Sequence, residues 1–181
     1  MLKYGVRILR PKEYEQLKRV MSPNERILID GLLTTGMRWI EAERFWRAPG
    51  WLDKKFINLP EGANGKKRAE YAERTIRLSD YGQKAVPAFL NNLTTMPTRG
   101  TWDWVIKERA KSAHLDPVHL CAKTTRKTWE SWLVFYFGEK VLTNVQLSQG
   151  HIAATQVKHY LGMAFYEEEK EGMAKYVDNW L

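Results

Sequence analysis

Two residues near the C-terminal end of the chain have side chains suited to chemistry on an anion. His151 follows a glycine, and Tyr160 stands nine residues later in the run QGHIAATQVKHY. On one unbroken helix this interval is roughly two and a half turns, so the two side chains would face opposite ways. Gly150 permits a bend that would bring them together. As a nucleophile, a phenol with an intrinsic pKa of about 10 would need cations around the group it attacks.

Two arginine-bearing phrases could supply those cations. Arg38, in TTGMRWIEAERF, follows a glycine and begins a predicted helix, whose N-terminal end favours an anion, and Glu41 on the same face could hold the guanidinium. Arg126 stands three residues after Lys123 in AKTTRKTW, so both lie on one helix face, and a phosphate would offset their repulsion. Taken alone, the first phrase could be an ordinary surface ion pair, and for the second a solvated basic face is the favoured interpretation.

A third group of cations lies on a glycine-bounded turn. Lys66 and Lys67 fall in NGKKRAEY, between the two best strand candidates, residues 55–59 and 74–79. A lysine at a hairpin tip can enter a DNA groove, and it can donate a proton when its neighbours set its pKa. A polar turn without function is the alternative.

Helical phrases dominate the elements that must position these residues. Ser22, Pro23 and Glu25 form a capping box that starts a helix, and Gly36 is a plausible stop. We expect mainly α structure with a small antiparallel β-sheet, an α+β fold. Further helices are expected from residue 11, from residue 37, over 79–93, 101–113 and 124–137, after residue 143, from about residue 153, and in a charged tail over 165–181 that Gly172 interrupts.

Composition places the chain among globular proteins with a basic surface. The 181 residues suit one domain, which we expect to span residues 1–181. Lys and Arg exceed Asp and Glu by 29 to 21, and a charge of +8 favours a polyanionic partner, although many basic proteins bind none. No apolar stretch is long enough to cross a membrane and no secretory signal is visible, so the expected location is the cytoplasm. We expect the single cysteine, Cys121, and four tryptophans, Trp39, Trp46, Trp129 and Trp132, to be buried.

In their order along the chain, these phrases resemble the active-site boxes of the tyrosine recombinases. TTGMRWIEAERF is similar to the first arginine box, T-G-x-R-x-x-E, and KTTR to the second, H-x-x-R. QGHIAATQVKHY resembles the L-G-H box followed by the tyrosine at the same interval, and the lysine-bearing turn lies where the family places it. The resemblance covers about residues 9–166, with 167–181 as a tail helix. We expect the family's separate N-terminal DNA-clamping domain to be absent.

The resemblance implies a reaction and roles for the residues. Tyr160 would attack a DNA phosphodiester and form a 3′-phosphotyrosyl link, while Arg38 and Arg126 would stabilise the charged transition state. It implies the tyrosine recombinase catalytic-domain fold and neither metal nor cofactor. His151 would donate a hydrogen bond to the phosphate, and Lys123 would take the histidine position. Lys66, or alternatively Lys67, would be the general acid, and Glu41 would support Arg38. The implied DNA contacts are Lys66, Lys67, Arg68 and Lys127.

Lys123 and Gln149 depart from the family pattern. Lys123 cannot act as an imidazole would. With a lysine at this position, the box looks closest to that of integrases from archaeal viruses and plasmids. Two alternatives stay open, which are a DNA-binding relative without catalysis and a topoisomerase or telomere resolvase with the same chemistry. The implied partners are double-stranded DNA and further copies of the chain, which would form a tetramer on DNA, and a monomer in the absence of DNA stays open. The tail would dock on its own or on a neighbouring protomer.

Overall fold

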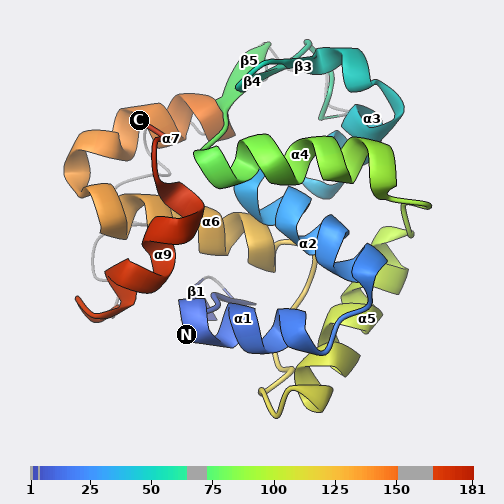
Figure 1. Cartoon of the computed structure of the whole chain (residues 1–181), viewed down its shortest axis with the longest axis vertical. Coiled ribbons are helices and arrows are strands. Elements are labelled where there is room, and N and C mark those ends of the chain that lie inside the picture. The colour runs from blue at the N-terminus through green and yellow to red at the C-terminus, as the bar shows by residue number, and fades with distance from the viewer. Residues whose placement is uncertain (1, 4, 65–72, 151–164) are drawn as a thin grey trace.

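A computed structural model describes residues 2–3, 5–64, 73–150 and 165–181 of the chain. It is mainly helical, with a small antiparallel sheet at one end (Figure 1). Helix α2 runs through the middle and packs on α4 and α6. The helices are α1 (Pro11–Arg19), α2 (Pro23–Thr35), α3 (Trp39–Arg47), α4 (Asp80–Asn92), α5 (Arg99–Ser112), α6 (Thr124–Phe137), α7 (Leu142–Gln149) and α9 (Glu169–Val177), with 3-10 turns η1 (Pro49–Trp51) and η3 (Glu139–Val141).

The central helix α2 begins and ends where its sequence signals predict. The Ser22 hydroxyl accepts a hydrogen bond from the Glu25 backbone N–H at 3.3 Å, and the Glu25 carboxylate accepts one from the Ser22 N–H at 2.7 Å. Gly36 ends the helix with a φ of 59°, in the left-handed region that glycine tolerates. The polypeptide therefore turns sharply just before Arg38.

The main sheet has three strands in the order β3-β4-β5, all antiparallel. The strands β4 (Phe56–Leu59) and β5 (Arg74–Arg77) confirm the two predicted strands, with Leu59 opposite Arg74 at the hairpin end. Two features were missed, the edge strand β3 (Leu52–Asp53) and a separate pair, β1 (Leu2–Lys3) with β2 (Val6–Arg7). Strands of two residues are too short to show an alternating pattern.

Large aromatic side chains fill the core between the helices. Trp129 and Trp132 on α6 are fully buried, Trp39 is buried, and Trp46 is partly buried against the core. The prediction for Cys121 was wrong, because this residue is only half-buried. It lies in the turn before α6, where its backbone N–H donates to the Thr124 hydroxyl at 3.1 Å. Surface turns of this kind leave one side of each residue in solvent.

The C-terminal tail packs on its own chain. Helix α9 lies against α1, α4 and α6 (Figure 1) and buries Met173, Tyr176 and Val177, followed by Trp180. The predicted interruption at Gly172 was wrong, because α9 continues through this residue. A Cβ atom at Gly172 would stand 2.8 Å from Cβ of Pro11, so glycine permits α9 to approach α1 closely.

Within the described parts of the chain, no helix is both long and apolar enough to cross a membrane.

Candidate functional site

Arg38 and Glu41 make the contact that their spacing predicts. The Arg38 backbone N–H donates to Glu41 Oε2 at 2.7 Å, and Arg38 Nη1 donates to Glu41 Oε1 at 2.8 Å. The Glu41 side chain is fully buried, whereas 31% of the Arg38 side chain remains exposed. Arg38 Nη2 also lies 3.5 Å from the carbonyl oxygen of Gly150. The guanidinium therefore bridges the start of α3 and the end of α7 while part of it faces solvent.

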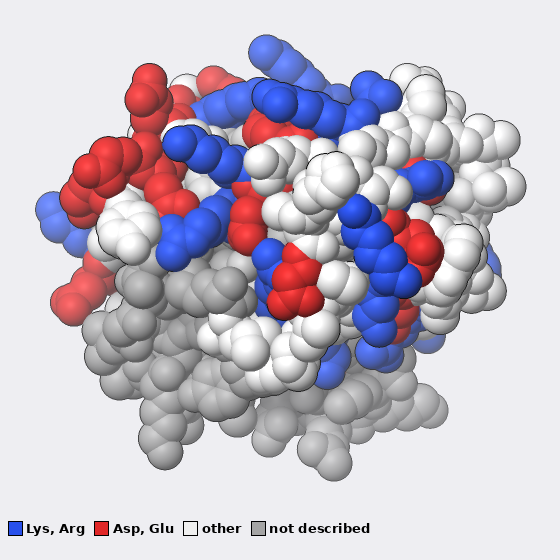
Figure 2. All heavy atoms as spheres, turned by 90° about the horizontal axis from the view of Figure 1, so that it is seen from below, with Lys and Arg blue, Asp and Glu red and all other residues white. Residues whose placement is uncertain are grey.

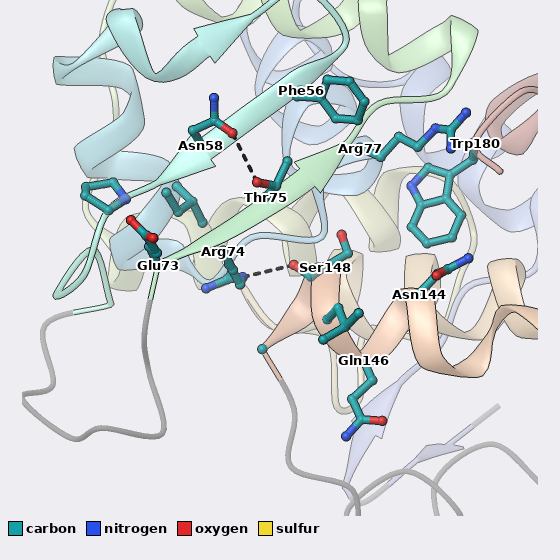
Figure 3. A pocket seen from close by; sticks show the side chains of 14 residues that line it. Phe56, Asn58, Glu73, Arg74, Thr75, Arg77, Asn144, Gln146, Ser148 and Trp180 are labelled. Atoms are coloured by element: carbon teal, nitrogen blue, oxygen red, sulfur yellow. Dashed lines mark hydrogen bonds between the residues drawn. The ribbon is translucent and has the colours of Figure 1, made fainter.

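Arg74, which the sequence marked only as a strand residue, reaches the same carboxylate from β5. Its Nη1 donates to Glu41 Oε1 at 2.9 Å and its Nη2 to Glu41 Oε2 at 2.8 Å. Its Nε donates to the carbonyl oxygen of Ser148 at 2.9 Å, as Figure 3 shows. One side chain thus joins β5, α3 and α7. An arginine just after a hairpin loop is common, so no signal in the sequence separated it from a surface residue.

Arg126 is buried on the first turn of α6. It contacts the C-terminal end of α7, which Arg74 also contacts. Its Nη1 donates to the Gly36 carbonyl oxygen at 2.9 Å and its Nη2 to that of Gln149 at 2.7 Å. Its Nε lies 3.0 Å from Glu130 Oε1, a fully buried carboxylate. The helix stop at Gly36 and the turn after α7 are therefore held together by one guanidinium.

The three arginines approach three successive backbone carbonyl oxygens. Arg74 binds that of Ser148, Arg126 that of Gln149, and Arg38 lies near that of Gly150. These carbonyls are at the C-terminal end of α7, where unpaired carbonyl groups carry partial negative charge and favour cations. We call Arg38, Arg74 and Arg126, with Glu41 and Glu130, the arginine cluster. It surrounds the backbone that leads directly into His151.

Close packing holds this turn against the end of α2. The Gln149 side chain is fully buried and its Nε2 donates to the Thr35 carbonyl oxygen at 3.3 Å. A Cβ atom on Gly36 would lie 2.6 Å from Nε2 of Gln149 and 2.8 Å from Cδ1 of Trp129. The glutamine that departs from the family pattern therefore has a defined packing role beside the arginine cluster.

Charge within the cluster shifts two pKa values. Burial by itself would raise the pKa of Glu41, but hydrogen bonds from Arg74 and the charges of Arg74, Arg126 and Arg38 lower it to about 2. Burial lowers the pKa of Arg126 to about 10, with the Glu130 charge acting in the opposite direction. Both side chains are therefore ionised at neutral pH.

Lys123 and Lys127 occupy different environments at the start of α6. Lys123 is exposed and forms no ion pair with another described residue, so it is accessible to an anion from solvent. Lys127 is half-buried, and its Nζ lies 3.0 Å from Glu130 Oε2. Its charge is therefore shared with the cluster, which reduces its value as a simple DNA contact. The structure brings Arg38, Glu41 and Arg126 together, with Lys127 joined through Glu130.

Five predicted site residues lie outside the described residues. They are Lys66, Lys67 and Arg68 of the lysine-bearing turn, and His151 and Tyr160 of the C-terminal box.

A pocket of about 940 Å³ adjoins the arginine cluster (Figure 3). It lies between β4, β5, α7 and Trp180, and Arg74 and Gly150 form part of its wall, whereas Arg38 and Arg126 do not. Over the face in Figure 2, basic and acidic side chains are interspersed, and acidic ones gather at one corner. The described basic residues on that face are therefore not collected into one patch.

Among the described residues, no group of three or more His, Cys, Asp or Glu side chains could hold a metal ion. No protein-family model matches the chain, and no curated protein or solved structure is significantly similar to it. The case for a function therefore depends on the arginine cluster and on the sequence phrases around it.

Proposed function

We propose that this chain is the catalytic domain of a tyrosine recombinase, a site-specific recombinase or integrase that cuts and rejoins double-stranded DNA without metal or ATP. It would act as a tetramer on DNA, in the compartment that holds the DNA. The supporting observation is the arginine cluster. Arg38 and Arg126, 88 residues apart in the sequence, converge on the carbonyls of Gln149 and Gly150, directly before His151.

This arrangement suits a reaction at a phosphodiester. Four basic side chains, Arg38, Arg74, Arg126 and Lys127, pair with two carboxylates, Glu41 and Glu130, so this group of six described residues carries a net positive charge. Guanidinium groups held in this way stabilise the extra negative charge of a pentacoordinate phosphoryl transition state without reorganising during the reaction.

In the proposed step, the Tyr160 phenolic oxygen bonds to phosphorus as the bond from phosphorus to the 5′-oxygen breaks. The phenol releases its proton to solvent water, and the 5′-oxygen takes one from Lys66 or Lys67, which later regains a proton from solvent. His151 donates a hydrogen bond to a phosphate oxygen, and exposed Lys123 contacts the same phosphate. Attack by a 5′-hydroxyl on the phosphotyrosyl link reverses the step, so the covalent bond conserves the energy of the cut. Lys66, Lys67 and Arg68 contribute DNA contacts, and Lys127, which is paired with Glu130, contributes less.

A DNA-binding relative without catalysis is the second candidate. Lys123 stands where the family has histidine, and Arg126 already donates to two carbonyl groups of its own chain. A topoisomerase or telomere resolvase would share the chemistry and differ only in its products, since it would relax supercoils or close hairpin ends.

A covalent trapping assay tests the proposal. Nicked suicide duplexes from the DNA that flanks the gene are incubated with the protein in EDTA, and adducts are separated in detergent. We expect a heat-stable adduct that Tyr160→Phe abolishes. Tyr166→Phe is the matched control, because this neighbouring tyrosine is 64% exposed and should not be the nucleophile. Tight, salt-sensitive DNA binding without any adduct would support the second candidate instead.

A further inference from the structure

The Glu41 carboxylate is shared by two arginines that come from different parts of the chain. Oε1 accepts from Arg38 Nη1 and Arg74 Nη1, and Oε2 accepts from the Arg38 backbone N–H and Arg74 Nη2. Four hydrogen bonds use the whole acceptor capacity of a carboxylate, which fixes its position and orientation. Neither arginine can move without breaking bonds at this buried group.

Sharing Glu41 also affects the charge on Arg38. One carboxylate paired with one guanidinium would largely cancel its charge, and the pair would attract an anion weakly. Here a single negative charge is divided between two guanidinium groups, so Glu41 fully neutralises neither of them. Because Arg74 is nearly buried and Arg38 is partly exposed, the remaining positive charge can reach an incoming phosphate through Arg38.

The third N–H group of Arg74 acts on the other side of the site. Its Nε donates to the Ser148 carbonyl oxygen (Figure 3), two residues before Gly150. At Gly150, where φ is 61°, a Cβ atom would lie 3.2 Å from Cδ of Arg74. The Arg74 stem is therefore packed against the turn as well as bonded to it. The residue itself is the first of β5, close behind the lysine-bearing turn.

We propose that Arg74 is a positioning residue that holds Arg38 through their common carboxylate and holds the turn before His151 through Ser148. This inference rests on the proposed function, and it adds a residue that the sequence did not identify. Arg74 would not touch DNA, but it would set the place and the effective charge of a group that does. It would also link the strand behind the lysine-bearing turn to the arginine cluster.

The test compares Arg74→Ala and Arg74→Lys with Arg77→Ala. Arg77 is on the same strand and makes no ion pair with any described residue, so it controls for the loss of a β5 arginine. Adduct formation is measured in single turnover at saturating DNA, below the melting temperature of every variant. We expect both Arg74 variants to react about 100-fold more slowly, a typical effect of misplacing a catalytic group by about 1 Å. Their dissociation constants for DNA should change far less than the rate, because Arg38 is one of several phosphate contacts in the proposed complex.

A lysine keeps the charge but cannot make the three-point contact, so a slow Arg74→Lys variant separates geometry from charge. A double-mutant cycle with Glu41→Gln supplies a readout that general destabilisation would not move. If Arg74 acts through Glu41, its replacement should slow the Glu41→Gln protein far less than it slows the wild type. Wild-type rates in Arg74→Ala, or losses that add in full, would overturn the inference.

Amide hydrogen exchange separates this inference from the proposed function. Arg74→Ala should accelerate exchange at the end of α7 and at the start of α3, whereas Arg77→Ala should not. If the wild type forms no adduct but exchange changes as expected, the proposed function fails and the positioning contact stands. If the wild type forms the adduct and exchange in α7 and α3 is unchanged in Arg74→Ala, the inference fails alone.

Discussion

The guanidinium of Arg126 donates a 2.7 Å hydrogen bond to the carbonyl oxygen of Gln149, two residues before His151. The same side chain donates to Gly36, two residues before Arg38. Two arginine-bearing phrases and the histidine-bearing phrase, which are far apart in the sequence, are thus joined through one buried side chain. This contact therefore couples the position of α6 to the end of α2 and to the end of α7.

Replacing Arg126 should damage folding as well as chemistry. Arg126→Ala removes the donor to the carbonyl groups of Gly36 and Gln149 and removes one of the cations that pair with the buried Glu130. Removing one member of a buried ion pair typically costs about 3–5 kcal/mol of unfolding free energy. Urea unfolding measures this loss. Arg126→Lys should lose less, because it retains the charge, and an Arg126→Ala protein as stable as the wild type would contradict the packing described.

Glu41 should make stability depend on pH in the acid range. Its pKa is about 2 in the folded protein against an ordinary 4.5, so the folded state favours the ionised form. The resulting stabilisation is complete above about pH 5 and is lost as the pH falls toward 2, which corresponds to about 3 kcal/mol.

Urea unfolding from about pH 7 to about pH 3 measures that slope. Glu41→Gln should be less stable at neutral pH, because Arg74 loses its counter-ion, and its stability should fall less as the solution is acidified. Equal slopes in the two proteins would show that another group carries the pH dependence.

Gly36 should tolerate no side chain, for two separable reasons. Alanine there meets a positive φ of 59° and a Cβ atom within 3 Å of both Gln149 and Trp129. Holding alanine in the left-handed backbone conformation costs about 1–2 kcal/mol of unfolding free energy, and overpacking adds about 1–3 kcal/mol. Gly62→Ala is the matched control, because Gly62 has a φ of 75° with no atom within 4 Å of the added carbon. Thermal unfolding should show a clearly larger loss for Gly36→Ala, and equal losses would rule out the clash.

Removing the tail should unfold the monomer. Deletion of residues 169–181 exposes the partners of Met173, Tyr176, Val177 and Trp180, all of which are almost fully buried. At about 1.5–3 kcal/mol for each buried side chain, the loss approaches the whole stability of a typical domain. Circular dichroism during heating checks this, with deletion of the partly exposed Leu181 alone as the control. A cooperative transition in the truncated protein would show that α9 is a detachable arm, available for exchange between protomers.

Helix boundaries and the overall fold class were accessible from the sequence because their causes are local. The capping box at Ser22 and the glycine at position 36 act on neighbouring backbone groups, and both work as predicted. The alternation in β4 and β5 is likewise a property of adjacent residues. Where the cause is not local, prediction failed. Gly172 indicated a break, but the close approach of Pro11 on a distant helix makes glycine suitable inside α9.

The sequence by itself determined which residue types are available, namely Arg38, Arg126, His151 and Tyr160 at intervals that resemble one family, and it determined the Arg38–Glu41 contact through their spacing on one helix. Only the tertiary structure decided that Arg74 shares Glu41 and that three arginines meet the successive carbonyl groups of residues 148–150. The physical reason is that a buried carboxylate and the carbonyl groups at a buried helix end need hydrogen-bond donors that their own helices do not supply. The chain can bring those donors from any segment that the packed core places nearby.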